Sequence, residues 1–238
     1  MKTKKPNVTV AIIPARKGSV GIPGKNHILL NGRRLIEYSI IAAINSKSID
    51  DIIVSTDCPE IKKICMSYKN KLTVLDRPSH LAQNISKLED VVAHACDSLI
   101  KKGVTIGKII LLQPTSPIRS AGQIDESINL FEESKMDSLI SVSEPTQHPF
   151  NFVSVKEGNI YYTCSRKERV SRRQDFPDAW FINGAIYITD YDFFSKSNLI
   201  YDLKRCTLYK MPIESSIDID TPFDLKICSS LLEKYEEI

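Results

Sequence analysis

Short apolar runs alternate with amphipathic segments along residues 8–143 of the chain. Residues 8–13 are continuously apolar and end at Pro14, which is typical of a strand buried on both faces. Between residues 35 and 44, apolar positions recur every three or four residues, which indicates an amphipathic helix. The alternation predicts βαβ units, and therefore an α/β fold with a doubly wound, mainly parallel sheet. It continues with strands expected at 52–56, 72–75, 109–112 and 138–142, and with helices expected from Pro59, at 88–100 and near 122–134.

The pattern changes between residues 145 and 180, where prolines at 145, 149 and 177 flank short strand-like pieces at 152–155 and 159–162. Sheet-forming sequence then resumes at 184–188 and 207–209, and a closing helix is expected from about Thr221. We therefore predict a single domain over residues 1–238, with the stretch 145–180 inserted in it rather than forming a second domain.

Composition and charge narrow the class of protein. Of the 238 residues, 42% are hydrophobic and 26% are charged, which excludes a mainly disordered chain. The difference between 32 basic and 29 acidic residues is a formal charge of +3, too small to demand a nucleic-acid partner. Taken alone, the basic run 166–173 is typical of a solvated face, and it has no aromatic residues interleaved for stacking on bases. We predict no nucleic-acid partner.

The cysteines and the N-terminal sequence bear on the compartment. The six cysteines include no CxxC pair, so a structural metal site is not expected. The apolar run 8–13 is too short for a signal peptide or a membrane span. We predict a cytoplasmic protein in a reducing compartment, with no membrane association.

The loop over residues 14–26 carries three glycines between the cations Arg16 and Lys25. Ligands of open α/β sheets bind at the carboxyl ends of the strands, and glycines let the backbone approach an anion closely. The spacing is not GxGxxG, and Asn26 stands where a Walker A loop needs Ser or Thr. A flexible, solvated turn is the alternative, but two prolines stiffen the loop, and we interpret it as an anion site.

The motif A-R-x-G-S-x-G-I-P-x-K-N at residues 15–26 resembles the signature of the CMP-sialic acid synthetases, the acylneuraminate cytidylyltransferases. That resemblance extends over nearly the whole chain and implies a Rossmann-like, GT-A-like nucleotidyltransferase fold. Further motifs similar to those of the family follow in the same order: VSTD at 54–57, RPxxLA at 77–82, LLQPTSPIR at 111–119, NGAIY at 183–187 and SIDIDT at 216–221.

The resemblance implies transfer of CMP from CTP to a nonulosonic acid, with release of pyrophosphate. A sugar hydroxyl attacks the α-phosphorus, so charge on the phosphate oxygens must be neutralised. The resemblance assigns Lys25 and Arg16 to catalysis. It assigns the following residues to nucleotide binding: Ala15, Arg16, Ser19, Lys25, Asn26 and Arg77.

For the acceptor sugar, the resemblance points to Gln113, Arg173, Asn183 and Tyr187. A nonulosonic acid carries a carboxylate, which a guanidinium such as that of Arg173 binds in bidentate fashion. The inserted stretch 145–180 resembles the dimerisation element of the family. A homodimer is therefore expected, in which arginines of the basic run line the neighbouring subunit's site.

Asp218 and Asp220 alternate with two isoleucines near the C-terminus. In an extended segment this spacing places both carboxylates on one side of the chain. Paired carboxylates suit Mg²⁺, which also takes water and phosphate oxygens as ligands. A helix cap is the alternative interpretation, because Asp220 precedes Thr221 and Pro222 at the expected helix start. Since Asp218 is not needed for a cap, we predict metal binding.

Some positions depart from the family pattern. Val20 stands where Lys is usual and Asn84 where Asp is common, and both changes bear on nucleotide affinity. Phe181 and Ile182 replace a frequent Arg-Pro pair, and Asn151 lies where some members have Lys, so the acceptor is either N-acetylneuraminate or a bacterial analogue such as legionaminate or pseudaminate. A CMP-Kdo-type or other sugar nucleotidyltransferase and a catalytically silent nucleotide-binding protein are the alternatives.

Overall fold

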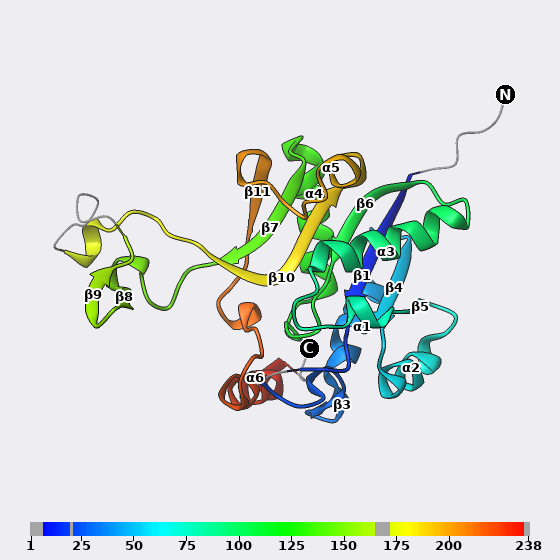
Figure 1. Cartoon of the computed structure of the whole chain (residues 1–238), viewed down its shortest axis with the longest axis horizontal. Helices are drawn as coiled ribbons and strands as arrows, with labels where there is room; N and C mark the ends of the chain where they lie inside the picture. The colour runs from blue at the N-terminus through cyan, green and yellow to red at the C-terminus, as the bar shows by residue number, and fades with distance from the viewer. Residues whose placement is uncertain (1–6, 20, 165–171, 236–238) are drawn as a thin grey trace.

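A seven-stranded sheet forms the centre of the molecule (Figure 1). The computed structural model describes residues 7–19, 21–164 and 172–235. The strands of the sheet are β1 (Val8–Pro14), β4 (Asp51–Thr56), β5 (Thr73–Asp76), β6 (Ile106–Leu111), β7 (Ser138–Ser143), β10 (Phe181–Asp190) and β11 (Cys206–Lys210). Their order is β11-β7-β10-β6-β1-β4-β5. Strand β10 runs antiparallel to β6 and β7, and the other pairs are parallel, which confirms the mainly parallel α/β sheet.

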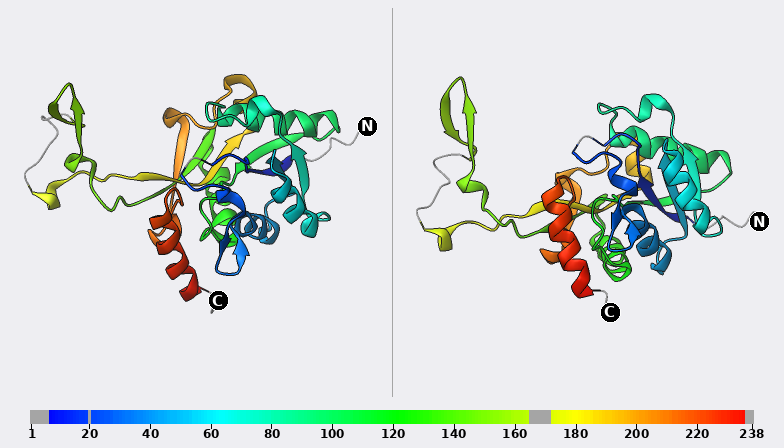
Figure 2. Two further views of the ribbon diagram at one scale, coloured as in Figure 1. Left: turned by 60° about the horizontal axis from the view of Figure 1, so that its bottom comes forward. Right: turned by 90° about the horizontal axis from the view of Figure 1, so that it is seen from below.

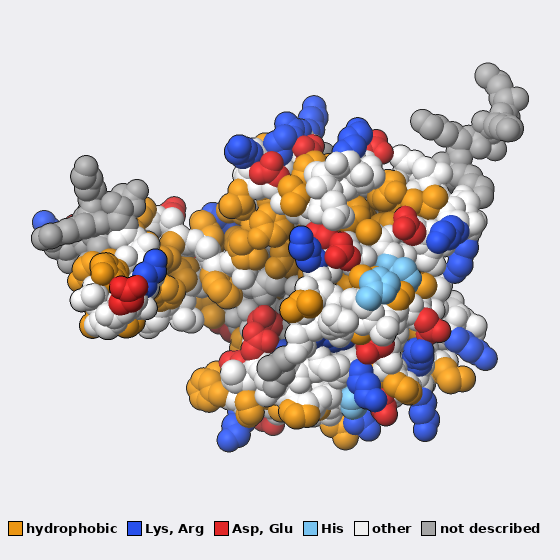
Figure 3. Space-filling model, in the orientation of Figure 1, with side chains coloured by type: hydrophobic (Ala, Val, Ile, Leu, Met, Phe, Trp, Pro, Cys, Tyr) orange, Lys and Arg blue, Asp and Glu red, His pale blue; other side chains and the backbone are white. Residues whose placement is uncertain are grey.

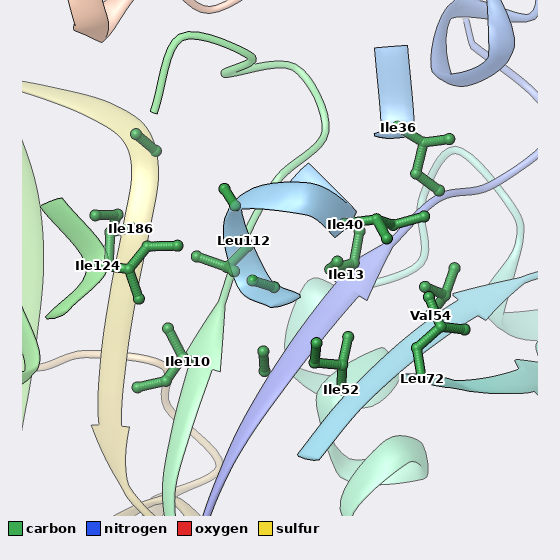
Figure 4. Packing of buried hydrophobic residues seen from close by; sticks show 14 of the residues in the cluster. Ile13, Ile36, Ile40, Ile52, Val54, Leu72, Ile110, Leu112, Ile124 and Ile186 are labelled. Carbon is green, nitrogen blue, oxygen red and sulfur yellow. The ribbon is translucent and has the colours of Figure 1, made fainter. Parts of the chain in front are cut away.

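Helices cover both faces of the sheet, as the doubly wound prediction requires. Helices α1 (Leu35–Asn45), α2 (Pro59–Cys65) and α4 (Ala121–Ser134) pack on one face, and α3 (Leu88–Lys101) and α5 (Tyr191–Ser197) pack on the other. Strand β1 shows why both faces are apolar, because Ala11 and Ile13 join the first cluster while Val10 and Ile12 join the second. Figure 4 shows the first cluster, in which Ile36 and Ile40 of α1 approach Ile13. Helix α6 (Pro222–Tyr235) packs beside the loop that follows β1 (Figure 2).

The structure contains two elements that the hydrophobic pattern does not predict. One is a small hairpin, β2 (Leu29–Leu30) and β3 (Arg33–Arg34), whose turn residues Asn31 and Gly32 have φ angles of 44° and 81°. The Asn-Gly pair is itself a hairpin signal. The other is α5, whose seven residues are too few to establish a helical period; Asp190 caps it by accepting a hydrogen bond from the Phe193 amide at 3.0 Å.

Between β7 and β10 the chain leaves the sheet and projects from the body of the molecule (Figures 1 and 2). We call residues 145–180 the arm. Its two strands, β8 (Val153–Lys156) and β9 (Asn159–Tyr162), form a hairpin that makes no pairing with the main sheet. Among the described residues, no helix combines the length and the apolar character needed to cross a membrane.

Candidate active site

A cavity of about 370 Å³ opens where β1, β5 and β6 end. Because these strands are parallel or joined by parallel neighbours, their carboxyl ends meet at one edge of the sheet, where ligands of such folds bind. We call it the central cavity. Its lining includes seven of the residues selected from the sequence: Arg16, Ser19, Lys25, Asn26, Arg77, Gln113 and Asp220.

The glycine-rich loop forms one wall of the central cavity and is held by its own contacts. Gly24 adopts a left-handed conformation, with φ of 66°, and starts the short 3₁₀ helix Lys25–His27. Asn26 is buried, and its side-chain amide donates to the Arg16 carbonyl at 3.1 Å. A Cβ added to Gly21 would lie 2.3 Å from the Asp220 carbonyl oxygen, so only glycine permits this approach. The loop is therefore pressed against the segment that carries the two aspartates.

Lys25 links the loop to that segment. Its Nζ atom donates to the Ile219 carbonyl at 2.6 Å and lies 2.9 Å from Oδ1 of Asp220. The Lys25 side chain is 12% exposed, whereas that of Asp220 is 72% exposed. A cation fixed at a cavity wall is suited to neutralising charge that develops on a phosphate.

Arg77 lies on the β4–β5 side of the cavity and is also buried. Its guanidinium donates to the Ser55 carbonyl at 2.8 Å and to the Ser55 hydroxyl at 3.2 Å. Burial lowers the pKa of Arg77 to about 10, which leaves the guanidinium charged at neutral pH. The amide of Ala15 donates to the same Ser55 carbonyl at 2.9 Å. Ala15 is fully buried behind the loop and is not among the described lining residues.

Arg16 meets the segment that follows Arg77. Its Nη1 atom donates to Oδ1 of Asn84 at 2.7 Å. Gln83, Asn84 and Ser86 line the central cavity but were not selected as binding residues from the sequence. Their signal is only their position after the RPxxLA motif. Val20 lies outside the described residues.

The two aspartates before α6 occupy different environments. Ile217 and Ile219 pack into the cluster beneath α6, in agreement with the alternating pattern. Burial raises the pKa of Asp218, and the neighbouring charge of Asp220 adds to that shift, while the Thr115 side chain opposes it. Oδ1 of Asp218 is buried and has no hydrogen-bond partner among the described residues. Thr221 caps α6, because its hydroxyl accepts from the Asp224 amide at 3.3 Å, and Oδ2 of Asp224 in turn accepts from the amides of Asp220 and Thr221 at 3.1 and 2.7 Å.

No cluster of three or more His, Cys, Asp or Glu side chains with metal-binding geometry occurs among the described residues. Asp57, a further acidic residue at a strand end, accepts a hydrogen bond from the Lys17 amide at 2.8 Å and so stabilises the loop turn. Of the carboxylates in the segment before α6, Asp218 has an unpartnered buried oxygen, Oδ1 of Asp220 faces Lys25, and Oδ2 of Asp224 accepts from two backbone amides.

Gln113 and Tyr187 approach each other next to a glycine on β10. A Cβ added to Gly184, which has φ of 74°, would lie 3.8 Å from Oε1 of Gln113 and 3.9 Å from the Tyr187 hydroxyl. Burial raises the pKa of Tyr187 to about 12, with smaller contributions from Tyr201 and Asp218. Gln113 and Tyr187 thus form a polar group that extends from the central cavity toward Asp218.

Asn183 has a different environment from the other predicted acceptor-binding residues. It is 1% exposed, and its amide accepts from the Ser141 hydroxyl at 2.5 Å and donates to the Ser216 hydroxyl at 2.8 Å. These contacts join β7, β10 and the segment before Asp218 at the irregular part of β10. Its sugar-binding role stays a prediction.

Arg173 begins the short 3₁₀ helix Arg173–Asp175 in the arm, and its side chain lies outside the described part of the chain. Residues 165–171 of the basic run also lie outside it. The part that Arg173 plays in binding a carboxylate therefore stays a prediction.

The sequence is similar to those of several bacterial enzymes. It is 31% identical over 221 residues to an N-acylneuraminate cytidylyltransferase of Streptococcus agalactiae, covering 90% of this chain and 51% of that protein. It is 32% identical to the CMP-N,N'-diacetyllegionaminic acid synthase of Legionella pneumophila, covering 96% of this chain and 97% of that protein. The chain thus spans about half the length of the streptococcal relatives and nearly all of the Legionella one.

Solved structures and a family model agree on the fold. A CMP:2-keto-3-deoxy-manno-octonic acid synthetase in complex with CTP superposes with a TM-score of 0.68 at 16% identity, covering 96% of this chain and 100% of that one. A 4-diphosphocytidyl-2C-methyl-D-erythritol synthase superposes with a TM-score of 0.70 at 11% identity, covering 95% and 100%. Both confirm the nucleotidyltransferase type of Rossmann-like fold. The cytidylyltransferase family model matches residues 10–238, and the chain belongs to the cytidylyltransferase family.

Proposed function

We propose that this chain transfers CMP from CTP to a nonulosonic acid of the sialic type, giving a CMP-sugar and pyrophosphate. The observation that carries the proposal is the wall of the central cavity, where Arg16, Lys25 and Arg77 converge at the strand ends beside a glycine-rich loop. Three fixed cations and close backbone approach suit a triphosphate. The relatives named above as N-acylneuraminate and legionaminic acid enzymes support the choice of acceptor.

In the proposed reaction, a sugar hydroxyl oxygen forms a bond to the α-phosphorus while the bond from that phosphorus to the β-phosphate oxygen breaks. The hydroxyl proton is lost, and pyrophosphate leaves. Catalysis of such a step depends mainly on position and charge. Lys25 and Arg16 are the catalytic cations of the proposal, and Ser19, Asn26, Ala15 and Arg77 hold the nucleotide.

We further propose that Asp218 and Asp220 hold Mg²⁺. The unpartnered, buried Oδ1 of Asp218 supports this, because it is an oxygen acceptor for which the described chain supplies no donor. Asp220 is close enough to raise the pKa of Asp218, so the two carboxylates are neighbours. The metal would supply further charge neutralisation at the phosphates.

Gln113, Arg173, Asn183 and Tyr187 are proposed to bind the acceptor. Gln113 lines the central cavity, and the Tyr187 hydroxyl lies beside the same glycine, Gly184, as the Gln113 side chain, which supports their assignment. Phe181 at the start of β10 is 55% exposed, and Asn151 is exposed in the arm, so both are available to contact a sugar.

We propose a homodimer formed through the arm, within a single cytidylyltransferase domain over residues 1–238. Val153 and Val155 face the same side of the hairpin as Ile160, which pairs with Val155, and each of the three is more than half exposed. Hydrophobic side chains gather on the arm in Figure 3. We also propose a cytoplasmic location without membrane association, in line with the reducing compartment expected from the wide spacing of the six cysteines.

Pyrophosphate release tests the proposal. The purified chain is incubated with CTP and Mg²⁺ and, in separate reactions, with N-acetylneuraminic, legionaminic, pseudaminic and 2-keto-3-deoxy-octonic acids. Release with one of the first three, together with the matching CMP-sugar in mass spectrometry, is the expected result. Release only with the octonic acid favours the CMP-Kdo-type alternative. If no acid supports release although CTP binds, the chain is a nucleotide-binding protein and the proposed activity is wrong.

A further inference from the structure

A second cleft, of about 570 Å³, lies between α1, the start of α4 and α6. We call it the α1–α4 cleft. It shares none of its described lining residues with the central cavity, and its lining contains two guanidinium side chains and no carboxylate. The residues that matter for the argument are Arg33, Tyr38, Arg119, Ser120, Ala121 and Leu232.

Arg119 gives this cleft an uncompensated positive charge. The residue is 3% exposed, and its guanidinium donates to the Ala185 carbonyl and the Ser39 hydroxyl, each at 2.6 Å. In the described part of the chain, Arg119 takes part in no ion pair, and its Nε–H group is buried without a partner. A buried cation that meets only neutral acceptors is costly, and an anion nearby lowers that cost. Burial also lowers the pKa of Arg119 to about 9.

The start of α4 adds positive potential at the same place. Ser120 is the N-cap, and its hydroxyl accepts from the Gln123 amide at 3.2 Å. The amides of Ala121 and Gly122 lie in the first turn, so the helix itself supplies no acceptors for them. The N-terminal end of a 14-residue helix also carries the positive end of its dipole.

Arg33 and Tyr38 complete the cleft at its exposed side. Arg33 is exposed, and its Cζ atom lies 6.0 Å from the centre of the Tyr38 ring. Tyr38, together with Leu232 of α6, offers apolar surface next to the two guanidinium groups. Asp125, an acidic residue of α4, is engaged by the Ser46 hydroxyl at 2.5 Å and by the amides of Lys47 and Ser48, each at 3.1 Å.

We infer that the α1–α4 cleft binds a small anion bearing a phosphate group, and that this site is distinct from the one that holds the reacting nucleotide. The volume is in the range of small-molecule sites, and the lining combines two cations and a helix N-terminus with apolar surface. Inorganic phosphate and an organic phosphate share the recognised group, and the titrations below distinguish them.

Arg119 also connects the two cavities. Its Nη1 atom lies 3.3 Å from the Gln113 carbonyl oxygen, to which the Ser39 hydroxyl donates at 3.2 Å. Gln113 lines the central cavity. An anion that draws on Arg119 therefore alters the support of Gln113, which lines the central cavity together with Arg16 and Lys25, and a change in nucleotide binding at those cations is expected. This coupling rests on the proposed use of the central cavity for CTP.

Calorimetric titration of the full chain tests the site. Inorganic phosphate and CMP are titrated separately into three proteins: the unmodified chain, Arg33→Glu and Lys63→Glu. The last is the control, because Lys63 is an exposed residue of α2 outside both cavities and its substitution changes the charge by the same amount. Titration of Lys25→Ala identifies the binding that belongs to the central cavity. We expect Arg33→Glu to weaken one binding event by ~10-fold or more, which corresponds to about 1.4 kcal/mol, while Lys63→Glu leaves it unchanged. If only CMP shows this event, the ligand is an organic phosphate. Equal binding of both probes by Arg33→Glu and Lys63→Glu would overturn the site.

The coupling is measured as the affinity for CTP with and without phosphate, so it requires no acceptor sugar and no turnover. Phosphate can also compete with CTP inside the central cavity, but this competition is expected to be the same in the unmodified chain and in Arg33→Glu, because Arg33 does not line that cavity. We expect the phosphate-induced change in the CTP dissociation constant to differ between them by ~5-fold or more, within the usual range of coupling energies. An identical change in both proteins overturns the coupling. Failure of the transferase assay with intact phosphate and CTP titrations would overturn the proposed activity but not this site.

Discussion

The central cavity and the arm differ in how their functional groups are supported. In the cavity, Lys25 donates to a backbone carbonyl and faces Asp220, and Arg77 donates twice to Ser55. In the arm, Val155 and Ile160 form a cross-strand pair on a hairpin of only two strands, and they are 67% and 72% exposed. One region positions charge by contacts within the chain, and the other presents apolar surface that the described part of the chain leaves exposed.

The difference follows from what each region has to do. Stabilising a phosphate transition state needs donors that are already oriented, because reorganisation during the reaction would cost rate. An apolar surface needs only to be covered, and a two-stranded hairpin is marginally stable without further packing. The comparison therefore favours a nucleotide site whose charged groups come from one chain and an arm whose apolar surface a second copy covers, and each part can be tested separately.

The largest effect is expected for Lys25→Ala. Removing one preorganised charge from a transition state lowers kcat by ~10²–10³-fold. Lys25→Ala also removes the hydrogen bond to the Ile219 carbonyl, so a modest fall in the melting temperature is expected while the fold is retained. Steady-state kinetics with CTP and the acceptor measures the loss. Lys17→Ala, an exposed cation on the same loop whose side chain forms no ion pair among the described residues, is the matched control and should retain activity. Near-normal turnover of Lys25→Ala would contradict its role.

Gly21→Ala tests whether the cavity depends on the close approach of two segments. The added Cβ meets the Asp220 carbonyl oxygen at 2.3 Å, so the loop or the aspartate segment has to move. Overpacking of this kind costs about 1–3 kcal/mol, and we expect CTP affinity to fall by ~5- to 150-fold. Gly18→Ala is the control, because nothing lies within 4 Å of its added Cβ. Equal CTP affinities for the two variants, measured by calorimetry, would show that this contact is not needed.

The arm is tested by Val155→Asp together with Ile160→Asp. Two charges placed at the centre of an apolar interface should shift the chain from dimer to monomer, and each central position is expected to contribute about 2 kcal/mol. Light scattering after size-exclusion chromatography measures the mass. CTP affinity should be unchanged, since no arm residue lines the central cavity among those described. Asn159→Asp, an exposed position of the same hairpin that pairs with Lys156 on its other side, should remain dimeric. A monomeric unmodified chain, or a dimer that survives the double substitution, would rule out this interface.

Periodicity was enough to predict the sheet and most of its helices, whereas the residues that converge on the central cavity were mostly assigned through the resemblance to family motifs. Both kinds of signal fail where a contact joins distant parts of the chain. Asn183 lies in a motif that suggests sugar binding, yet its polar groups are satisfied by Ser141 and Ser216, from different elements. The approach of Gly21 to Asp220, across about two hundred residues of sequence, is likewise invisible in any local pattern.

The same limit applies to polar environment. The alternation of Asp218 and Asp220 with isoleucine predicts which side each residue faces, and the packing of Ile219 agrees with it. It does not predict that Asp218 is half-buried with one oxygen unpartnered while Asp220 is 72% exposed, because that depends on contacts with distant residues such as Thr115. The helix cap that was the alternative role for Asp220 is formed instead by Thr221 and Asp224, each of which accepts a hydrogen bond from the amide of the other.

Asp218→Asn should separate stability from metal binding. Burial raises the pKa of Asp218, so the folded state holds this proton more tightly than the unfolded state does, and stability falls as pH rises through that raised pKa. At pH 7, Asp218→Asn should therefore melt at an equal or higher temperature than the unmodified chain. The Mg²⁺ concentration that gives half-maximal activity should rise by ~10-fold or more, the size of effect that substitutions at metal sites commonly have.

Asp224→Asn is the control for Asp218→Asn, and its expected change in melting temperature has the opposite sign. Burial acts against ionisation of Asp224, but hydrogen bonds from Thr221 and Asp220 outweigh it and lower its pKa. The ionised Asp224 carboxylate stabilises the folded state at pH values above its pKa in the unfolded chain, and this stabilisation is lost as the pH falls through its pKa in the folded chain. Asp224→Asn should therefore melt at a lower temperature than the unmodified chain at pH 7. An unchanged Mg²⁺ titration for Asp218→Asn would show that Asp218 is not a metal ligand.

The smallest effect is expected for Asn84→Asp, at the edge of the cavity. Arg16 donates to Asn84 at 2.7 Å, and a carboxylate in that place would hold the guanidinium in a charge-assisted bond that competes with the triphosphate. Exposed ion pairs contribute about 0.2–1 kcal/mol, so KM for CTP should rise by no more than ~5-fold. The rise should shrink at high salt, since screening weakens exposed pairs. Asn84→Ala, which releases Arg16 without adding charge, should leave KM equal or lower. If Asn84→Asp lowers KM instead, Asn84 orients Arg16 for the nucleotide rather than competing with it.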